Sequence, residues 1–114
     1  MSVPSLKLPS GQSMAIDEKG YLLDWIAWSR LVAETMAGAD GVDLSGDHWI
    51  VLAIFREYFE KYEIEPPMRA LVRLVRERLG EEKGNSRHLY RLFPDGPGIQ
   101  ACRYAGLPRP LSCV

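Results

Sequence analysis

Two cysteines, Cys102 and Cys113, are the residues of this chain whose type and spacing best support covalent chemistry. Ten residues separate them, and Cys113 is the penultimate residue. The stretch Gly106-Leu107-Pro108-Arg109-Pro110 lies between them, and its two prolines fit neither a helix nor a central strand. The sequence therefore predicts a flexible arm over residues 107–114 that carries Cys113 to a partner. A thiolate placed in this way can attack the sulfur of a persulfide or a disulfide.

Cys102, in contrast, is expected inside a helix. Pro97 suits the first turn of that helix, Ile99 and Cys102 lie three residues apart on one face, and Gly106 can end it. Closing the short loop between the cysteines costs little entropy, so a Cys102–Cys113 disulfide is within geometric reach. Simpler interpretations remain open for both residues. Cys102 could be a small buried apolar residue, and Cys113 could be a thiol on a frayed terminus.

The elements that must position these cysteines are mostly helical. We expect one domain over residues 1–106, mostly α in class (α+β), built as a small bundle of about five helices with an N-terminal β-hairpin. The hairpin is predicted from two short apolar runs that flank Pro9-Ser10-Gly11-Gln12. The helices that precede the cysteine helix are predicted at about 25–37 with Asp24 as cap, from Ser45 to about 62, from Pro67 to 79, and from Asn85 to about 93.

Apolar residues at helical spacing predict which faces are buried. The clearest stripe is in the second helix, and further stripes predict core positions in the first and third. A histidine on the main stripe, His48, is expected to be a hydrogen-bonded structural residue, because no nucleophile or carboxylate pairs with it in the sequence. The predicted core positions are Trp28, Leu31, Val32 and Met36; His48, Leu52, Phe55, Phe59 and Tyr62; and Met68, Leu71, Val72, Val75 and Leu79.

Charge is divided unevenly along the chain, although the net charge is only −1. Residues 1–65 hold five Lys/Arg and eleven Asp/Glu, a net of −6, whereas residues 66–114 hold nine and four, a net of +5. The basic part contains both cysteines. We predict that it docks an acidic partner protein or phosphates. The alternative is an ordinary solvated helix face. The predicted docking residues are Arg69, Arg73, Arg76, Arg103 and Arg109.

Several short motifs, in order along the chain, resemble the sulfur-carrier family that includes the gamma subunit of dissimilatory sulfite reductase (DsrC) and the tRNA-thiolation relay protein TusE. They are Gly20-Tyr21-Leu22, His48-Trp49, Arg56-Glu57-Tyr58, Pro67-Met68-Arg69, Lys83-Gly84-Asn85-Ser86, Leu89-Tyr90-Arg91-Leu92-Phe93-Pro94, Gln100-Ala101-Cys102 and Ala105-Gly106-Leu107-Pro108, followed by the penultimate Cys113. The resemblance begins at about Ile16 and covers nearly all of the chain after it.

The resemblance implies that Cys113 carries sulfur as a persulfide. In the sulfite-reductase branch the cysteine that matches Cys102 forms a disulfide or trisulfide with it, whereas the tRNA branch generally lacks that cysteine. The usual ending of the family, Pro-Lys-Pro-Thr-Gly-Cys-Val, differs here at Arg109, Leu111 and Ser112. Cys102 favours the sulfite-reductase branch, while Leu111-Ser112 keeps the tRNA branch open. The orthogonal packing of the bundle is also implied by the resemblance alone.

The partners implied are a sulfite reductase or a tRNA-thiolating enzyme, an upstream sulfur-transfer complex, and a membrane electron-transfer complex that the chain itself does not enter. A different class remains open: the second and third helices could form a DNA-binding helix-turn-helix with Arg69, Arg73 and Arg76 facing a groove.

Other features of the sequence narrow the function. The start has no signal-peptide pattern, and no apolar run approaches the length of a membrane span, so we expect a cytoplasmic protein whose thiols stay reduced. Two cysteines and two scattered histidines match no metal-ligand spacing, so no metal and no cofactor are expected. The sequence has no catalytic triad, nucleotide loop or paired carboxylates. We therefore expect a carrier or an enzyme subunit, not a stand-alone catalyst.

Overall fold

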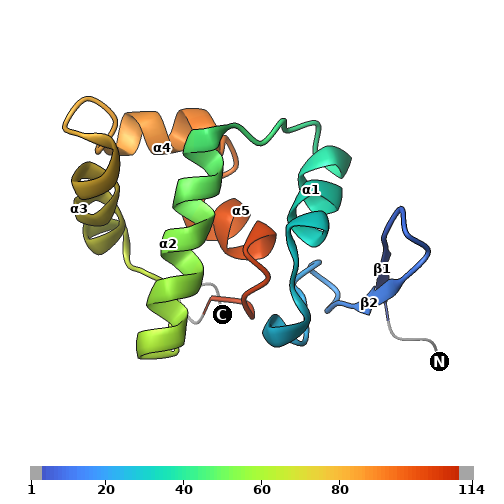
Figure 1. Cartoon of the computed structure of the whole chain (residues 1–114). Helices are drawn as coiled ribbons and strands as arrows, with labels where there is room; N and C mark the ends of the chain where they lie inside the picture. The colour runs from blue at the N-terminus through green and yellow to red at the C-terminus, as the bar shows by residue number, and fades with distance from the viewer. Residues whose placement is uncertain (1–3, 111–114) are drawn as a thin grey trace.

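The computed structural model describes residues 4–110 and shows a helical bundle with a small hairpin at its N-terminal end (Figure 1). The prediction of five α-helices behind an N-terminal hairpin is confirmed for these residues. The elements in order are β1 (Ser5–Lys7), β2 (Ser13–Ala15), a 3₁₀ turn (Trp25–Ala27), α1 (Arg30–Ala39), α2 (Gly46–Tyr62), α3 (Met68–Leu79), α4 (Ser86–Leu92) and α5 (Pro97–Tyr104).

The hairpin forms where the sequence predicted it. Its antiparallel register pairs Leu6 with Met14, and Gly11 supplies the positive φ of 94° that the reversal needs. Met14 is buried, which attaches the hairpin to the rest of the domain.

The prediction of a single helix at 25–37 is wrong, because the structure divides this stretch into a 3₁₀ turn and α1. Asp24 does act as a cap, but it accepts a hydrogen bond from the Ile26 amide and starts only a 3₁₀ turn. Trp28 then adopts an extended conformation (φ −65°, ψ 147°), and a new helix, α1, begins after Ser29. Because Trp28 is extended, its indole reaches the Tyr104 carbonyl at the end of α5 and donates a hydrogen bond to it.

The N-terminus of α2 is closed by a capping box, as the predicted cap at Ser45 requires. The Ser45 hydroxyl accepts from the His48 amide, and the His48 ring accepts from the Ser45 amide. His48 Nε2 lies 2.8 Å from the carbonyl oxygen of Leu92. Since Nδ1 accepts from Ser45, Nε2 carries the proton and donates to Leu92. His48 is therefore the hydrogen-bonded structural histidine that was predicted.

The predicted core faces are confirmed near the centre of the bundle and wrong at its edge. Among the predicted positions, Val32, Met36, Leu52, Phe55, Leu71 and Val75 are buried. Tyr62 and Met68, however, are 52% and 37% exposed. Tyr62 is the last residue of α2, and Met68 is the first residue of α3. Helix α3 ends at Gly80 (φ 90°) and the Asn85 side chain caps α4, both as predicted.

Helix α5 is the centre of the bundle. It packs against α1, α2 and α4, and Figure 1 shows it between α2 and α1. The core around it contains fully buried side chains from most of the helices and from the segment that follows α5, including Val32, Phe55, Val75, Leu89, Phe93, Tyr104 and Leu107. No helix within residues 4–110 is long and apolar enough to cross a membrane.

The expected arm at 107–114 is packed over its first part. Leu107 is fully buried and Pro110 is also buried. The prolines do exclude helix and sheet, but they do not prevent this stretch from lying against the domain. The remaining residues of the expected arm, including Cys113, lie outside the described part of the chain.

Candidate functional site

Cys102 lies on the buried face of α5 and has no solvent-exposed area. The packing predicted for this cysteine is confirmed, although Ile99, expected on the same face, is 45% exposed. After α5 the chain turns back along the helix. The Leu107 amide donates to the Cys102 carbonyl at 3.2 Å, and Cys102 Sγ lies 3.5 Å from the Pro108 carbonyl oxygen. The segment that leads toward Cys113 therefore passes directly over the Cys102 thiol.

The reversal depends on Gly106. Its φ is +75°, a conformation that side chains with a Cβ rarely adopt. A Cβ at this position would also lie only 2.3 Å from Cδ1 of the Trp28 ring. The ring is held in this place because its Nε1 donates to the Tyr104 carbonyl at 2.8 Å. Gly106 was predicted as a helix stop, and the structure adds a steric requirement from a residue far away in the sequence.

Arg56, in the middle of α2, also holds the turn at Gly106 in place. Its guanidinium donates to the Ala105 carbonyl at 2.8 Å and to the Trp25 carbonyl at 3.0 Å, and it stacks 4.3 Å from the centre of the Trp28 ring. Burial lowers the pKa of Arg56, while Glu60 acts in the opposite direction. The carbonyls at the C-terminal end of a helix lack partners within the helix and carry partial negative charge, so a cation there is favourable.

This role of Arg56 was not predicted from the sequence. The available signal was its position four residues after Leu52, on the edge of the apolar stripe of α2. A charged residue at such a position needs polar partners. Nothing in the spacing, however, indicated that those partners are backbone carbonyls 31 and 49 residues away.

Arg103, one of the predicted docking residues, is engaged within the domain. Its guanidinium donates to the Asp40 carboxylate, which also accepts from the Tyr104 hydroxyl at 2.6 Å. Burial, together with the hydrogen bond to Asp40, raises the pKa of Tyr104 to about 12. This network joins the end of α1 to the end of α5 and holds the helix that carries Cys102.

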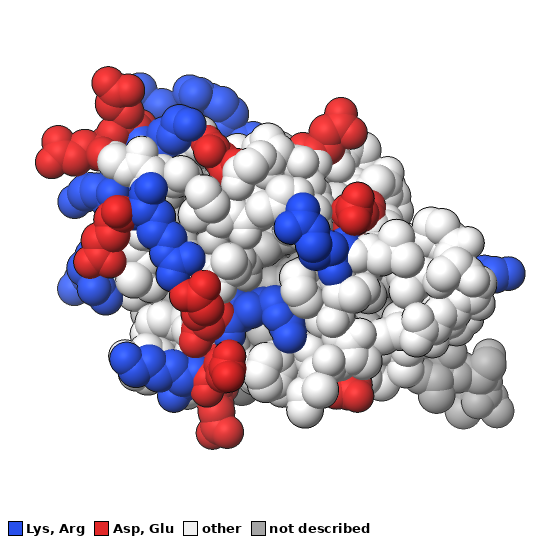
Figure 2. Space-filling model, viewed as in Figure 1, with Lys and Arg blue, Asp and Glu red and all other residues white. Residues whose placement is uncertain are grey.

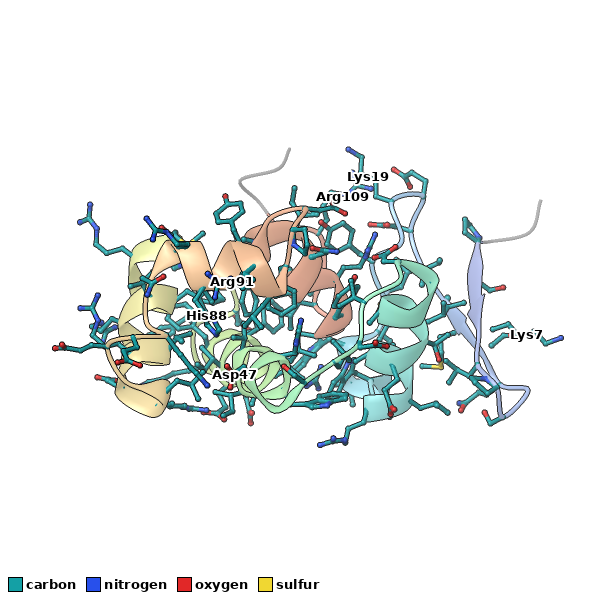
Figure 3. All side chains as sticks on the ribbon, turned by 90° about the horizontal axis from the view of Figure 1, so that it is seen from above. Lys7, Lys19, Asp47, His88, Arg91 and Arg109 are labelled. Atoms are coloured by element: carbon teal, nitrogen blue, oxygen red, sulfur yellow. The ribbon has the colours of Figure 1, made fainter. Side chains whose placement is uncertain are left out.

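Arg109, another predicted docking residue, also has internal partners. It lies 3.2 Å from the Asp17 carboxylate and 2.9 Å from that of Glu18. Figure 3 shows it beside the turn that carries Lys19, next to the end of the described chain. Arg109 therefore ties the segment after Gly106 to the turn that follows β2.

The other three predicted docking residues lie together on α3, and all are exposed. Arg73 is 4.0 Å from Glu77, and Arg76 donates to the Gly84 carbonyl at 3.1 Å. For Arg69 no ion pair is found among the described residues. Figure 2 shows charged side chains of both signs gathered at the α3 end of the molecule, while the opposite end is mostly uncharged on this face. The five predicted docking arginines thus form two separate groups.

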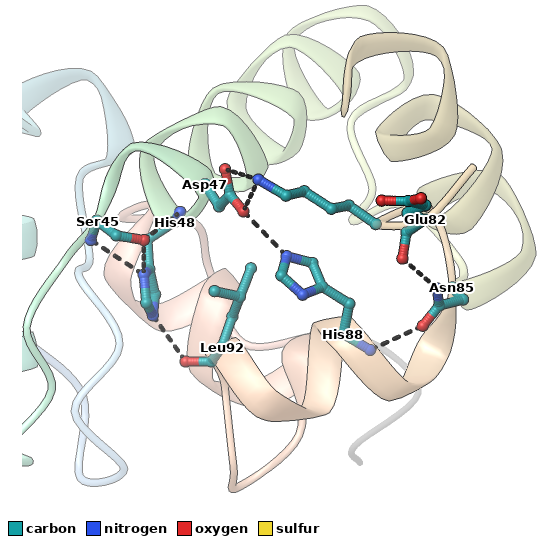
Figure 4. A network of polar contacts seen from close by, with 8 residues as sticks. Ser45, Asp47, His48, Glu82, Asn85, His88 and Leu92 are labelled. Atoms are coloured by element: carbon teal, nitrogen blue, oxygen red, sulfur yellow. Dashed lines mark hydrogen bonds and ion pairs between the residues drawn. The ribbon is translucent and has the colours of Figure 1, made fainter. Parts of the chain in front are cut away.

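A polar network joins the start of α2 to α4 and to the loop before it (Figure 4). Asp47 lies 3.0 Å from Lys83 Nζ and 3.1 Å from His88 Nε2. Lys83, followed by His88, lowers the pKa of the Asp47 carboxyl, although partial burial opposes them. The Asn85 cap accepts from the His88 amide at 2.9 Å. Each polar group in this network has a structural partner, so its role is to hold α4 against α2.

The described residues contain no group of three or more His, Cys, Asp or Glu side chains that could hold a metal ion. These residues place the buried Cys102 thiol beneath the segment that follows Gly106, and Trp28 and Arg56 hold the turn between them.

This combination of fold and site defines a small helical protein built around a cysteine-bearing C-terminal segment. The DsrC-like protein family matches residues 9–114, and the chain belongs to that family. Among curated relatives, the protein named sulfurtransferase TusE from Pectobacterium atrosepticum is 43% identical over 104 residues, covering 91% of this chain and 95% of its own. The protein of the same name from Salmonella typhimurium matches with the same identity and coverage.

Solved structures agree with this assignment. The NMR structure of DsrC from Allochromatium vinosum is 45% identical, covers 99% of this chain and all of its own, and superposes with a TM-score of 0.87. The crystal structure of the oxidized gamma subunit of dissimilatory sulfite reductase from Archaeoglobus fulgidus is 38% identical, covers 97% of this chain and all of its own, and has a TM-score of 0.88.

Proposed function

We propose that this protein is a sulfur-relay sulfurtransferase of the TusE type, which carries sulfur on Cys113 and delivers it to a tRNA-thiolating enzyme. The observation that carries the proposal is the 43% identity to curated TusE sulfurtransferases over 91% of the chain. From the sequence alone, the presence of Cys102 favours the sulfite-reductase branch. The curated relatives support the other branch better, and the complete burial of Cys102 is compatible with a packing role.

In the proposed step, the Cys113 thiolate attacks the terminal sulfur of a donor persulfide. The sulfur–sulfur bond of the donor breaks as a new one forms at Cys113, and the donor leaves as a thiolate. No net oxidation or reduction takes place, because the sulfane sulfur only changes its carrier. Cys102 is not needed for this transfer, and the turn at Gly106 directs the segment that bears Cys113.

The experiment that distinguishes the branches is a reconstituted transfer. The full chain is loaded from a persulfide donor and offered in parallel to a tRNA-thiolating enzyme with its tRNA and to a sirohaem sulfite reductase. We expect thiolated tRNA from the wild type and from Cys102→Ser, and none from Cys113→Ser. Turnover only with the sulfite reductase, dependent on both cysteines, would return the protein to the DsrC branch.

A further inference from the structure

Several large apolar side chains are exposed together where α3, α4 and α5 meet. Met68, Tyr90 and Ile99 are 37%, 51% and 45% exposed, and all three line one groove of about 340 Å³. Exposed apolar side chains that gather in one groove mark interaction sites more often than isolated ones do. Methionine and tyrosine are also among the residues enriched in protein–protein interfaces.

A second groove, of about 790 Å³, adjoins the first and shares Pro67 and Met68 with it. Its lining includes Arg69, Arg73 and Arg76, together with the apolar Val72. Its lining, drawn from residues 67–86, includes no aspartate or glutamate. Among the described residues, the ion pair found for these three arginines is the long contact of 4.0 Å between Arg73 and Glu77.

We propose that the two grooves together bind a single amphipathic segment of the partner protein, with acidic residues over α3 and an apolar anchor between Met68, Tyr90 and Ile99. This rests on the proposed sulfur-transfer function. The direction of the segment follows from charge. Glu65 and Asp95 line the apolar groove, so carboxylates of the partner are repelled there and attracted toward the arginines of α3.

The apolar part of the surface favours a protein over a nucleic acid as the partner. A phosphodiester backbone satisfies the arginines but leaves Met68 and Ile99 exposed to water, whereas a leucine or phenylalanine side chain buries them. The position also suits the proposed function. Ile99 precedes Cys102 by three residues on α5, a rise of about 4.5 Å along the helix axis. A partner bound here lies beside the helix that supports the sulfur-carrying segment.

The test begins with selection of a random dodecapeptide phage library on the immobilised full-length protein. We expect the enriched peptides to combine Asp or Glu with Leu, Ile or Phe. One synthetic peptide from the selection is then labelled and titrated at low salt. We expect binding at least tenfold weaker for Arg69→Glu/Arg73→Glu and also for Met68→Ser/Ile99→Ser. The matched control, Lys7→Glu/Lys19→Glu, reverses two exposed charges near the hairpin and should bind within twofold of the wild type (Figure 3).

Three results would overturn the proposal: no enrichment, enriched peptides without acidic residues, or a peptide that binds the α3 variant as tightly as the control. Displacement of the peptide by a 20-nucleotide RNA at lower concentration than by unlabelled peptide would assign the surface to nucleic acid instead. Loading of Cys113 from a small-molecule persulfide is measured on every variant. The α3 variant should load normally, which separates failure of docking from failure of the carrier function.

Discussion

Replacing Gly106 with alanine tests how the segment that carries Cys113 is directed. The change adds one methyl group at a position with two separate restrictions. The backbone φ of +75° is unfavourable for any residue with a Cβ, at a cost of about 1–2 kcal/mol. The new Cβ would also lie 2.3, 2.8 and 2.9 Å from three carbon atoms of Trp28.

Trp28 cannot move away without loss. Its ring donates a hydrogen bond to the Tyr104 carbonyl at 2.8 Å and stacks against Arg56, so a shift weakens both contacts. Inserting a methyl group into a packed site of this kind costs about 1–3 kcal/mol. We therefore expect Gly106→Ala to lower the free energy of unfolding by about 2–5 kcal/mol, the sum of the two effects. Urea denaturation followed by circular dichroism measures it.

The matched control is Gly98→Ala, at the opposite end of α5. A Cβ there meets no atom within 4 Å and φ is not positive, so this change should be neutral or stabilise by up to about 1 kcal/mol. Combining Gly106→Ala with Trp28→Ala removes the ring that causes the clash, and the double variant should lose less than the sum of the single changes. Strict additivity, or a loss below about 1 kcal/mol for Gly106→Ala, would show that the Trp28 ring does not restrict this position.

Three further predictions rest on Arg56, Asp47 and Cys102. Arg56→Lys should lower the free energy of unfolding in urea by about 1–3 kcal/mol, because an ammonium cannot bridge the carbonyls of Trp25 and Ala105 while stacking on Trp28. Equal stability would show that the bridge is unimportant. Asp47→Asn should make the free energy of unfolding depend less on pH in the acid range. The pKa of Asp47 is lowered in the folded state, so its contribution to stability is present above the unfolded-state pKa and is lost as the pH falls through the folded-state pKa. Unfolding midpoints measured from pH 7 down to pH 2 that stay parallel to those of the wild type would contradict this. Finally, the sequence places a Cys102–Cys113 disulfide within reach, but a Cys102 that only packs should leave mild oxidation with dimers linked through Cys113. A loss of two hydrogens in the monomer that is absent from Cys102→Ser would show that the pair closes and would favour the sulfite-reductase branch.

The sequence predicted the local structure well because caps and periodicity are local signals. Ser45 and Asn85 cap α2 and α4, Gly80 ends α3, and the hairpin forms around Gly11. The same logic failed at residues 25–37. There the apolar spacing fits one helix, but the hydrogen bond from Trp28 to Tyr104, 76 residues away, favours an extended residue that divides it. Long-range partners of this kind leave no periodic signal.

The candidate site was predictable in its residues but not in its arrangement. Cys102 could be recognised as a packed helix residue, and the arginines of α3 as an exposed stripe. The ion pairs of Arg103 with Asp40 and of Arg109 with Asp17 and Glu18 could not, because each joins segments more than 60 residues apart. The contacts of Arg56 and Trp28 with the turn at Gly106 also join distant segments, so they could be seen only in the structure.

Mapping the persulfide by mass tests whether Cys113 is the residue that carries the sulfur. The full chain is treated briefly with a persulfide donor, the remaining thiols are alkylated, and the tryptic peptides are analysed. We expect the mass of one added sulfur atom first on the peptide with Cys113, while the buried Cys102 is modified slowly by sulfur and by the alkylating agent. Sulfur found first on Cys102, or loading that persists in Cys113→Ser, would contradict it.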